Sequence, residues 1–342
     1  MQHEITQAIP LLDEQGELTQ PGWARRLLPV YDRSRVRGGP LRLKERDCYL
    51  VMNRQCALAL TISDNRYMGM DSISLIDLWE GWQVTRSPMR LMPLGGTGLP
   101  QSSLRGSCAR AGRGYGLLFQ HEGEGRTLHA HMDRFRDGQA LDAQILLTQE
   151  PEESIVMCTP FEKPGQFYFN QKINCMRAQG KVTLGDREYV FDPEDSFAVL
   201  DWGRGVWTCR GTWYWGSASG MVDGVPFGFN IGYGFGDTSA ATENALFYGG
   251  KLHKLSQVTF HIPRKNGREH YLAPWTFDSD DRRFRMKFRP ILDRAACPSA
   301  GVVRSGQHQV FGSFTGTAVL DDGTAVRLKE LLGCAEKVDD RW

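Results

Sequence analysis

The sequence predicts an all-β protein built as a sandwich or a barrel. Turn-forming glycine, proline, asparagine and aspartate residues recur about every 8–12 residues, the spacing of short antiparallel strands joined by tight turns. Many segments between the turns alternate apolar and polar residues, as strands with one buried face do. Helical periodicity is nearly absent. We expect short helices only at residues 21–28, which Pro29 ends, and near Ala240.

Length and charge narrow the class of protein further. A chain of 342 residues favours two domains, which we place at residues 1–178, with an N-terminal arm and the short helix, and at residues 179–342. The net charge of +1, without a basic stripe, argues against nucleic-acid binding. No apolar run reaches the length of a transmembrane helix, so we expect no transmembrane segment.

Cysteine usage and the N-terminus predict a cytoplasmic protein without a metal or cofactor. None of the eight cysteines has the C-x-x-C spacing of zinc or redox sites, so we expect reduced and mostly buried thiols. The N-terminus has no basic-then-apolar signal pattern. His129 and His131 share one strand face, but no third metal ligand follows nearby, so we expect structural or surface roles for them.

The first half of the chain predicts strands joined by tight turns. Residues 43–60 form two strands around a turn at Asn53 and Arg54, and residues 70–79 form another. Residues 117–131 form a hairpin that turns at Gly123 and Gly125, and residues 142–147 add a short strand.

Polar residues follow one face of the strand predicted after Phe169. Asn170, Lys172 and Asn174 alternate with more apolar neighbours. Three such groups would be costly to bury without partners, so they face water, a polar cavity or each other. A polar cavity would make them ligand-binding residues, and a solvated strand edge is the simpler alternative.

The most aromatic stretch, residues 201–236, follows a hairpin at residues 180–191. Trp213 and Trp215 share one face of a strand, and a turn at Asp223 and Gly224 leads into the next strand. That strand has aromatic and aliphatic side chains on one face. Its other face carries Gly228, Asn230, Gly232 and Gly234.

Glycine in a strand costs backbone entropy and packs nothing, so something bulky must lie against that face. The bulky group is either tryptophans of the neighbouring strand or a ligand. A ligand would occupy a pocket with walls formed by Trp207, Trp213 and Trp215 and with Asn230 on its floor. An aromatic core packed on glycine is the alternative.

The remaining strands are short. Residues 243–261 predict a hairpin that turns at Gly249 and Gly250, and further strands lie near residues 274–275, 284–288 and 310–320. His308 beside Gln309 is a polar pair, which we consider both as a ligand contact and as a structural histidine.

Several strings resemble the DUF2804 family. They are IPLLDEQGELTQPGW, NQKIN, DWGRGVW, WYWGSASG, ATENALFYGGKLHKL, APW and CAEKVDDRW, and they span nearly the whole chain. More distantly, residues 180–203 are similar to the AttH and carotenoid 1,2-hydratase group. Here Phe197 or Val199 stands where that group has its first tryptophan, and Asp201 and Trp202 are adjacent instead of spaced.

The resemblance implies two lipocalin-like antiparallel β-barrels or sandwiches packed side by side, with few short helices. It also implies a site for isoprenoid- or polyketide-like apolar molecules. The DUF2804 family itself implies no particular activity.

Two carboxyl groups could support chemistry on such a molecule. Hydration or cyclisation of a carbon–carbon double bond needs a proton donor in an apolar site and aromatic faces that stabilise a cation. Asp201 and Glu243 are the candidate acids, because a carboxyl walled by tryptophan has a raised pKa. Asn244, beside Glu243, is a candidate ligand contact. The alternatives are a turn-capping role for Asp201 and a salt bridge of Glu243 with Arg204 or Lys172.

Three functions therefore stay open. We favour a carrier of an apolar, isoprenoid- or lipid-like small molecule. The second is a cofactor-free lyase or isomerase that acts on such a molecule. The third is a structural or partner-binding β-protein whose aromatic stretch is only core. The sequence leaves the oligomeric state open.

Overall fold

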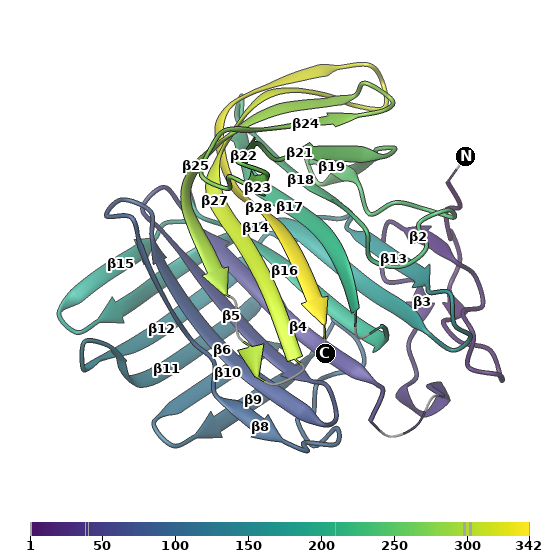
Figure 1. The fold of residues 1–342 in the computed structure, drawn as a ribbon, viewed down its shortest axis with the longest axis horizontal. Coiled ribbons are helices and arrows are strands. Elements are labelled where there is room, and N and C mark those ends of the chain that lie inside the picture. The colour runs from purple at the N-terminus through teal and green to yellow at the C-terminus, as the bar shows by residue number, and fades with distance from the viewer. Residues whose placement is uncertain are drawn as a thin grey trace.

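Strands dominate the chain, so the prediction of an all-β fold is confirmed (Figure 1). The computed structural model describes residues 2–37, 39, 41–208, 210–296, 299–300 and 303–341. Cys209 and Cys297 lie outside the described residues. The six other cysteines are free thiols.

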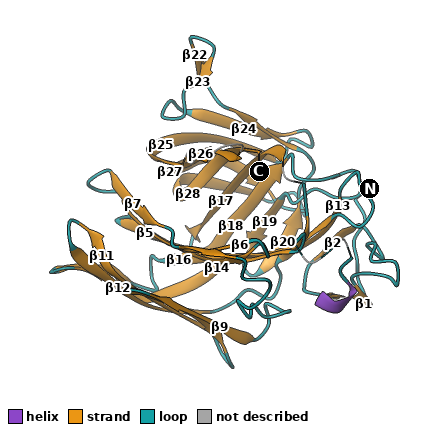
Figure 2. Ribbon diagram, turned by 60° about the horizontal axis from the view of Figure 1, so that its bottom comes forward, coloured by secondary structure: helices purple, strands orange, loops and turns teal. Residues whose placement is uncertain are grey.

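The first large sheet has fourteen strands, in the order β7-β6-β5-β4-β16-β14-β12-β11-β10-β9, with four further strands paired beside this path. It curls, so that β9, β11 and β12 lie below β5, β6 and β16 (Figure 2). An apolar core that includes Leu58, Phe119 and Leu128 fills the curl. The strands are β2 (Gly22–Ala24), β4 (Lys44–Met52), β5 (Cys56–Asp64), β6 (Met68–Asp77), β7 (Trp82–Arg86), β8 (Met89–Leu91), β9 (Gly106–Gly112), β10 (Tyr115–His121), β11 (Arg126–Arg136), β12 (Gln139–Thr148), β13 (Ile155–Pro160), β14 (Phe167–Leu184), β15 (Arg187–Phe191) and β16 (Phe197–Val206).

The second large sheet has ten strands, in the order β20-β19-β18-β17-β28-β27-β25-β24-β21, with β26 beside β27. Its own core includes Phe227, Phe229, Ile231 and Trp275. The strands are β17 (Arg210–Val222), β18 (Val225–Tyr233), β19 (Ala245–Tyr248), β20 (Lys251–Lys254), β21 (Val258–His261), β24 (Trp275–Ser279), β25 (Phe284–Ala296), β26 (Ser299–Ala300), β27 (Val303–Val319) and β28 (Ala325–Arg341). Two small pairs are separate: β1 (Ile9–Pro10) with β3 (Pro29–Val30), and β22 (Arg264–Lys265) with β23 (Arg268–Glu269).

The predicted hairpin turns are confirmed where turn chemistry was strongest. Asp223 and Gly224 join β17 to β18 with φ angles of 49° and 78°, as a two-residue turn of the primed type requires. Gly185 and Asp186 join β14 to β15, and Gly249 and Gly250 join β19 to β20.

The helix predicted at residues 21–28 is wrong, and so is the one near Ala240. Residues 22–24 form β2, which pairs antiparallel with β13, and Trp23 is buried. Pairing with an available sheet edge outweighs the weak local helix preference of this segment. The helical element described is a single 3-10 turn, Arg33–Arg35, capped where the Asp32 carboxylate accepts from the amide of Ser34.

The domain boundary predicted after residue 178 falls inside β14, which runs unbroken from Phe167 to Leu184. The two large sheets divide later, between Val206 and Arg210. Whether the sheets behave as separate domains stays a prediction.

The two sheets pack face to face, and we call this contact the seam. An apolar cluster joins Leu50 and Met52 of the first sheet to Leu292 and Phe311 of the second. The N-terminal arm also crosses to the loop between β18 and β19 of the second sheet, where the amide of His3 donates to the carbonyl of Ala240 at 2.9 Å.

Candidate functional site

The polar face of β14 points into the seam. Asn170, Lys172 and Asn174 are all buried, so the solvated-edge alternative is wrong. Asn174 Nδ2 donates to Ser217 Oγ at 2.8 Å and to the carbonyl of Phe229 at 3.1 Å, both in the second sheet. Sequence alternation placed these side chains on one face, and the packing of the sheets buries that face.

Lys172, Asp201 and Arg46 form a charged triad at the seam. The Asp201 carboxylate lies between the Lys172 ammonium and the Arg46 guanidinium and accepts a hydrogen bond from each. Lys172 and Asp201 stand directly opposite each other on β14 and β16. The sequence did not indicate Arg46, because its approach depends on the register of β4 against β16.

The triad keeps Asp201 ionised. Burial alone would raise the pKa of Asp201, but Arg46 and Lys172 outweigh it and lower that pKa below its usual range. Burial would likewise lower the pKa of Lys172, yet Asp201 raises it. This geometry favours Asp201 as a fixed anion rather than a proton donor, and it does not match the turn-capping alternative.

Glu243 is held differently. Asn230 Nδ2 donates to Glu243 Oε2 at 3.0 Å and to the Glu243 carbonyl at 2.9 Å, while Trp215 Nε1 donates to Asn230 Oδ1 at 2.7 Å. Burial raises the pKa of Glu243, and Lys172 and Asn230 offset only part of this rise. Among the described residues, Glu243 has no ion-pair partner within 4.0 Å, so neither predicted salt bridge forms; Arg204 pairs with Asp47 instead.

The glycine face of β18 is filled by the chain itself. A Cβ atom at Gly228 would lie 2.6 Å from Cys175 Sγ of β14, and one at Gly232 would lie 2.6 Å from Glu243 Oε1. The nearest side chains at these two positions therefore belong to Cys175 and Glu243. Trp215, which stands opposite Gly232 on β17, also lies against this face and donates to Asn230. The glycines let the first sheet and a carboxyl group approach the backbone of β18 closely.

Beside this polar region lies a group of rings that we call the aromatic cluster: Tyr168, Trp207, Trp213 and Phe235. The Phe235 centroid is 4.8 Å from that of Tyr168, 5.1 Å from that of Trp213 and 5.9 Å from that of Trp207, all edge-on. Trp207, Trp213 and Phe235 remain partly exposed. Tyr168 shares its strand face with Asn170, so alternation alone could have indicated it.

The Lys172 ammonium joins the two regions. Its Nζ lies 5.9 Å from the Tyr168 ring centroid and 5.7 Å from that of Trp215. The aromatic cluster, the charged triad and Glu243 therefore lie around one lysine.

Asn244 and His308 are not part of this arrangement. Asn244 accepts from the amide of Gly232 at 2.7 Å and donates to the Ser256 carbonyl at 2.9 Å, so its amide fixes local backbone. His308 stacks on Tyr271 at 3.8 Å and pairs with Asp293.

The sequence did not indicate a further carboxyl group at the seam, which is buried. Glu336 of β28 accepts from Gln307 Nε2 at 3.0 Å and from Gln309 Nε2 at 3.1 Å. Burial raises the pKa of Glu336 as well. It lies opposite Trp215 in the register of β17 and β28.

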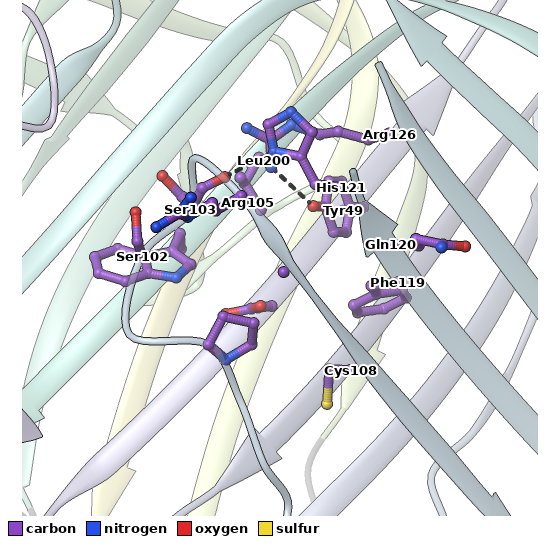
Figure 3. Close-up of a pocket in the computed structure, with 14 residues that line it drawn as sticks. Tyr49, Ser102, Ser103, Arg105, Cys108, Phe119, Gln120, His121, Arg126 and Leu200 are labelled. Atoms are coloured by element: carbon purple, nitrogen blue, oxygen red, sulfur yellow. Dashed lines mark hydrogen bonds between the residues drawn. The ribbon is translucent and has the colours of Figure 1, made fainter. Parts of the chain in front are cut away.

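Two cavities lie elsewhere. The first sits inside the first sheet among Tyr49, Ser103, His121 and Arg126 (Figure 3), and about 20 Å³ of it is open to the centre of a water-sized sphere, which is room for about one water. The second, of about 120 Å³ by the same measure, lies beside Phe161. Phe161 in turn packs edge-on against Phe235 of the aromatic cluster at 5.3 Å.

The described residues contain no group of three or more histidine, cysteine, aspartate or glutamate side chains placed to hold a metal ion. Among the same residues, no helix has the length and apolar character needed to cross a membrane.

The family model for DUF2804, a domain of unknown function, matches residues 2–342. The chain belongs to the DUF2804 family. This confirms the resemblance stated from the sequence strings. No curated protein matches the sequence of this DUF2804 chain.

Solved structures are similar to this DUF2804 chain in fold. An AttH candidate (NE1406) from Nitrosomonas europaea is 12% identical with a TM-score of 0.50, over 90% of this chain and 95% of that one. Kievitone hydratase from Nectria haematococca is 9% identical with a TM-score of 0.47, over 98% of each chain. CghA with Sch210972 is 11% identical with a TM-score of 0.47, over 97% of this chain and 98% of that one. At these identities the likeness concerns the fold alone, and the AttH likeness supports the lipocalin-like class.

Proposed function

We propose that this chain binds an apolar small molecule, isoprenoid- or lipid-like, at the seam, as its carrier. The observation that carries the proposal is the partial exposure of Trp207, Trp213 and Phe235 beside the charged triad. Large rings that contact one another and still face solvent form an apolar surface of the kind that binding sites use.

The polar side of the seam supports a ligand that also carries a hydroxyl group. Asn170 Oδ1 and Asn174 Oδ1 are buried and have no hydrogen-bond partner among the described residues. Buried carbonyl oxygens are nearly always paired, so these two acceptors suit a donor that enters from outside the chain. They flank Lys172 on the same face of β14.

Glu243 favours a second candidate function, that of a cofactor-free lyase or isomerase. Its raised pKa makes it the better proton donor of the two predicted acids. In a hydration, the Glu243 proton would pass to one carbon of a double bond and leave a cation facing the rings. Water would add to the other carbon and return a proton to Glu243. Asp201 would act as a positioning residue through Lys172.

Retinol, an isoprenoid polyene with one hydroxyl group, is a suitable probe. We expect it to quench tryptophan fluorescence saturably, with at least a tenfold weaker affinity in Trp207→Ala and Trp213→Ala. Trp79→Ala is the matched control, since Trp79 is exposed and outside the cluster. Quenching that does not saturate, or that is equal in all variants, would contradict binding at the seam.

The lyase candidate needs its own measurement. The protein would be incubated with isoprenoid alkenes in heavy water, and deuterium in the products would be measured by mass spectrometry. Glu243→Gln should abolish incorporation and keep retinol affinity within about tenfold. Equal incorporation by wild type and Glu243→Gln would remove the catalytic candidate and leave the carrier.

A further inference from the structure

An exposed apolar run lies at β8, an edge strand of the first sheet. We call Met89, Leu91, Met92 and Leu94 the β8 patch; their exposed fractions range from 52% to 87%. Four of the thirteen large apolar side chains that the described residues expose thus fall within six consecutive positions. Single exposed apolar residues are ordinary, but a contiguous group of them marks an interaction surface.

The backbone fixes this run in its exposed position. Met92 and Leu94 have φ angles of 49° and 51°, a left-handed conformation that side chains of this size rarely adopt. The amide of Met92 donates to the Tyr67 carbonyl, and the amide of Leu94 donates to the Arg66 carbonyl, both at 3.0 Å. The apolar side chains are therefore held outward by specific hydrogen bonds.

Positively charged residues flank the β8 patch along the chain. Residues 81–121 contain five arginines and no aspartate, glutamate or lysine. Arg86, three residues before the patch, and Arg113, in the turn between β9 and β10, are both exposed. Neither has an ion-pair partner within 4.0 Å among the described residues, and Arg86 Nε donates to the Phe135 carbonyl at 2.9 Å, which leaves its terminal nitrogens for a ligand.

A buried carboxylate ties the patch to the neighbouring hairpin. Asp71 of β6 pairs with Arg90 of β8 at 2.9 Å and lies 3.8 Å from Arg110 of β9. Tyr115, two residues after Arg113, donates to the same carboxylate at 2.9 Å. Figure 1 shows β8 and β9 together at the lower edge of the molecule. The free arginine of the hairpin therefore belongs to the same edge as the β8 patch.

We propose that the β8 patch docks this protein onto an anionic lipid bilayer. The apolar side chains would enter the boundary between headgroups and acyl chains, and Arg86 and Arg113 would contact lipid phosphates. A second copy of the chain fits less well. β8 offers only three residues for strand pairing, and the arginines of two copies, which have no acidic partner, would repel each other. The β8 patch is separate from the seam, so the lipid-docking proposal can fail without affecting the proposed function, and the reverse also holds.

Co-sedimentation of the full chain with vesicles tests this proposal. We expect binding to phosphatidylcholine vesicles with about a third phosphatidylglycerol, weaker binding to pure phosphatidylcholine, and weakening at high salt. The double variant Leu91→Ser/Met92→Ser should bind at least tenfold more weakly. Leu272→Ser, also exposed but in the second half of the chain, should bind as wild type does.

Arginine variants separate the charge contribution. Arg86→Gln/Arg113→Gln should lose most of the salt-dependent binding, whereas Arg264→Gln/Arg268→Gln, exposed on the β22–β23 hairpin, should not. All four variants change exposed side chains, so circular dichroism should show wild-type folding. Absent binding to anionic vesicles, or equal binding by wild type and Leu91→Ser/Met92→Ser, overturns the proposal. So does self-association without lipid that the same double variant abolishes, because the patch would then bind a second copy.

Discussion

The Asp201→Asn substitution tests the charged triad most directly. It removes the carboxylate that Lys172 and Arg46 share and leaves the Lys172 ammonium, only 4% exposed, without its counter-charge. Removing one partner of a buried pair costs about 3–5 kcal/mol. Asp201 is 14% exposed and Arg46 is 40% exposed, so solvent compensates Arg46 and we expect about 3 kcal/mol.

A double-mutant cycle isolates the interaction between Asp201 and Lys172. Lys172→Met leaves Asp201 paired with Arg46, so we expect a smaller loss of about 1–2 kcal/mol. Asp201→Asn/Lys172→Met should lose less than the sum of the two single losses, with a coupling of about 1–2 kcal/mol. The measurement is the free energy of unfolding in urea at pH 7, from linear extrapolation. If the loss of the double variant equals the sum of the two single losses to within about 0.5 kcal/mol, the predicted interaction of Asp201 with Lys172 is refuted.

The loss of stability in Asp201→Asn should depend on pH in a direction that the pKa of Asp201 predicts. The folded pKa of Asp201 lies below its ordinary value, so its stabilising contribution is complete above the unfolded pKa of about 3.9. It is lost as the pH falls through the folded pKa. The deficit of Asp201→Asn should therefore shrink below about pH 4, and a constant deficit would contradict the lowered pKa.

Three further changes probe the seam. Burial raises the pKa of Glu243, so the wild type should lose stability relative to Glu243→Gln as the pH rises above the unfolded pKa of about 4.3. Urea midpoints of the two proteins that stay parallel with pH would contradict the raised pKa. Gly228→Ala should cost about 1–3 kcal/mol of unfolding free energy, because the new methyl group overpacks against Cys175. Adding Cys175→Ala should recover part of this loss, and no recovery would mean that the methyl group clashes with other atoms. Trp215→Phe should cost about 1–3 kcal/mol, because the buried Asn230 oxygen loses its donor, and an unchanged unfolding curve would count against that hydrogen bond.

The sequence predicted local features well where they depend on neighbouring residues. Turn chemistry located the β17–β18 hairpin, and alternation placed Asn170, Lys172 and Asn174 on one face. Alternation also separated Phe229 from the glycine face of β18. These features depend on backbone conformation and on a period of two residues, both of which are visible in a short window.

The sequence did not predict what lies across the seam. It could not indicate that Cys175 would fill the space over Gly228 or that Arg46 would reach Asp201, because both contacts depend on register and on how two sheets pack. The helix expected at residues 21–28 failed for the same reason, since the edge of β13 is supplied by distant residues. Asp201 and Glu243 looked alike as acids, and only their surroundings gave their pKa values opposite shifts.

The N-terminal arm affects how well the chain would reassemble if it were made as two fragments. A break between Val206 and Arg210 would leave every strand of both sheets whole, whereas a break after residue 178 would sever β14. After the first break, the N-terminal arm of one fragment would still contact the other fragment, because Gln2 Nε2 donates to the Leu255 carbonyl at 2.8 Å. Fragments 1–206 and 210–342, made separately, should therefore reassemble when mixed, and deleting residues 1–4 should slow their reunion.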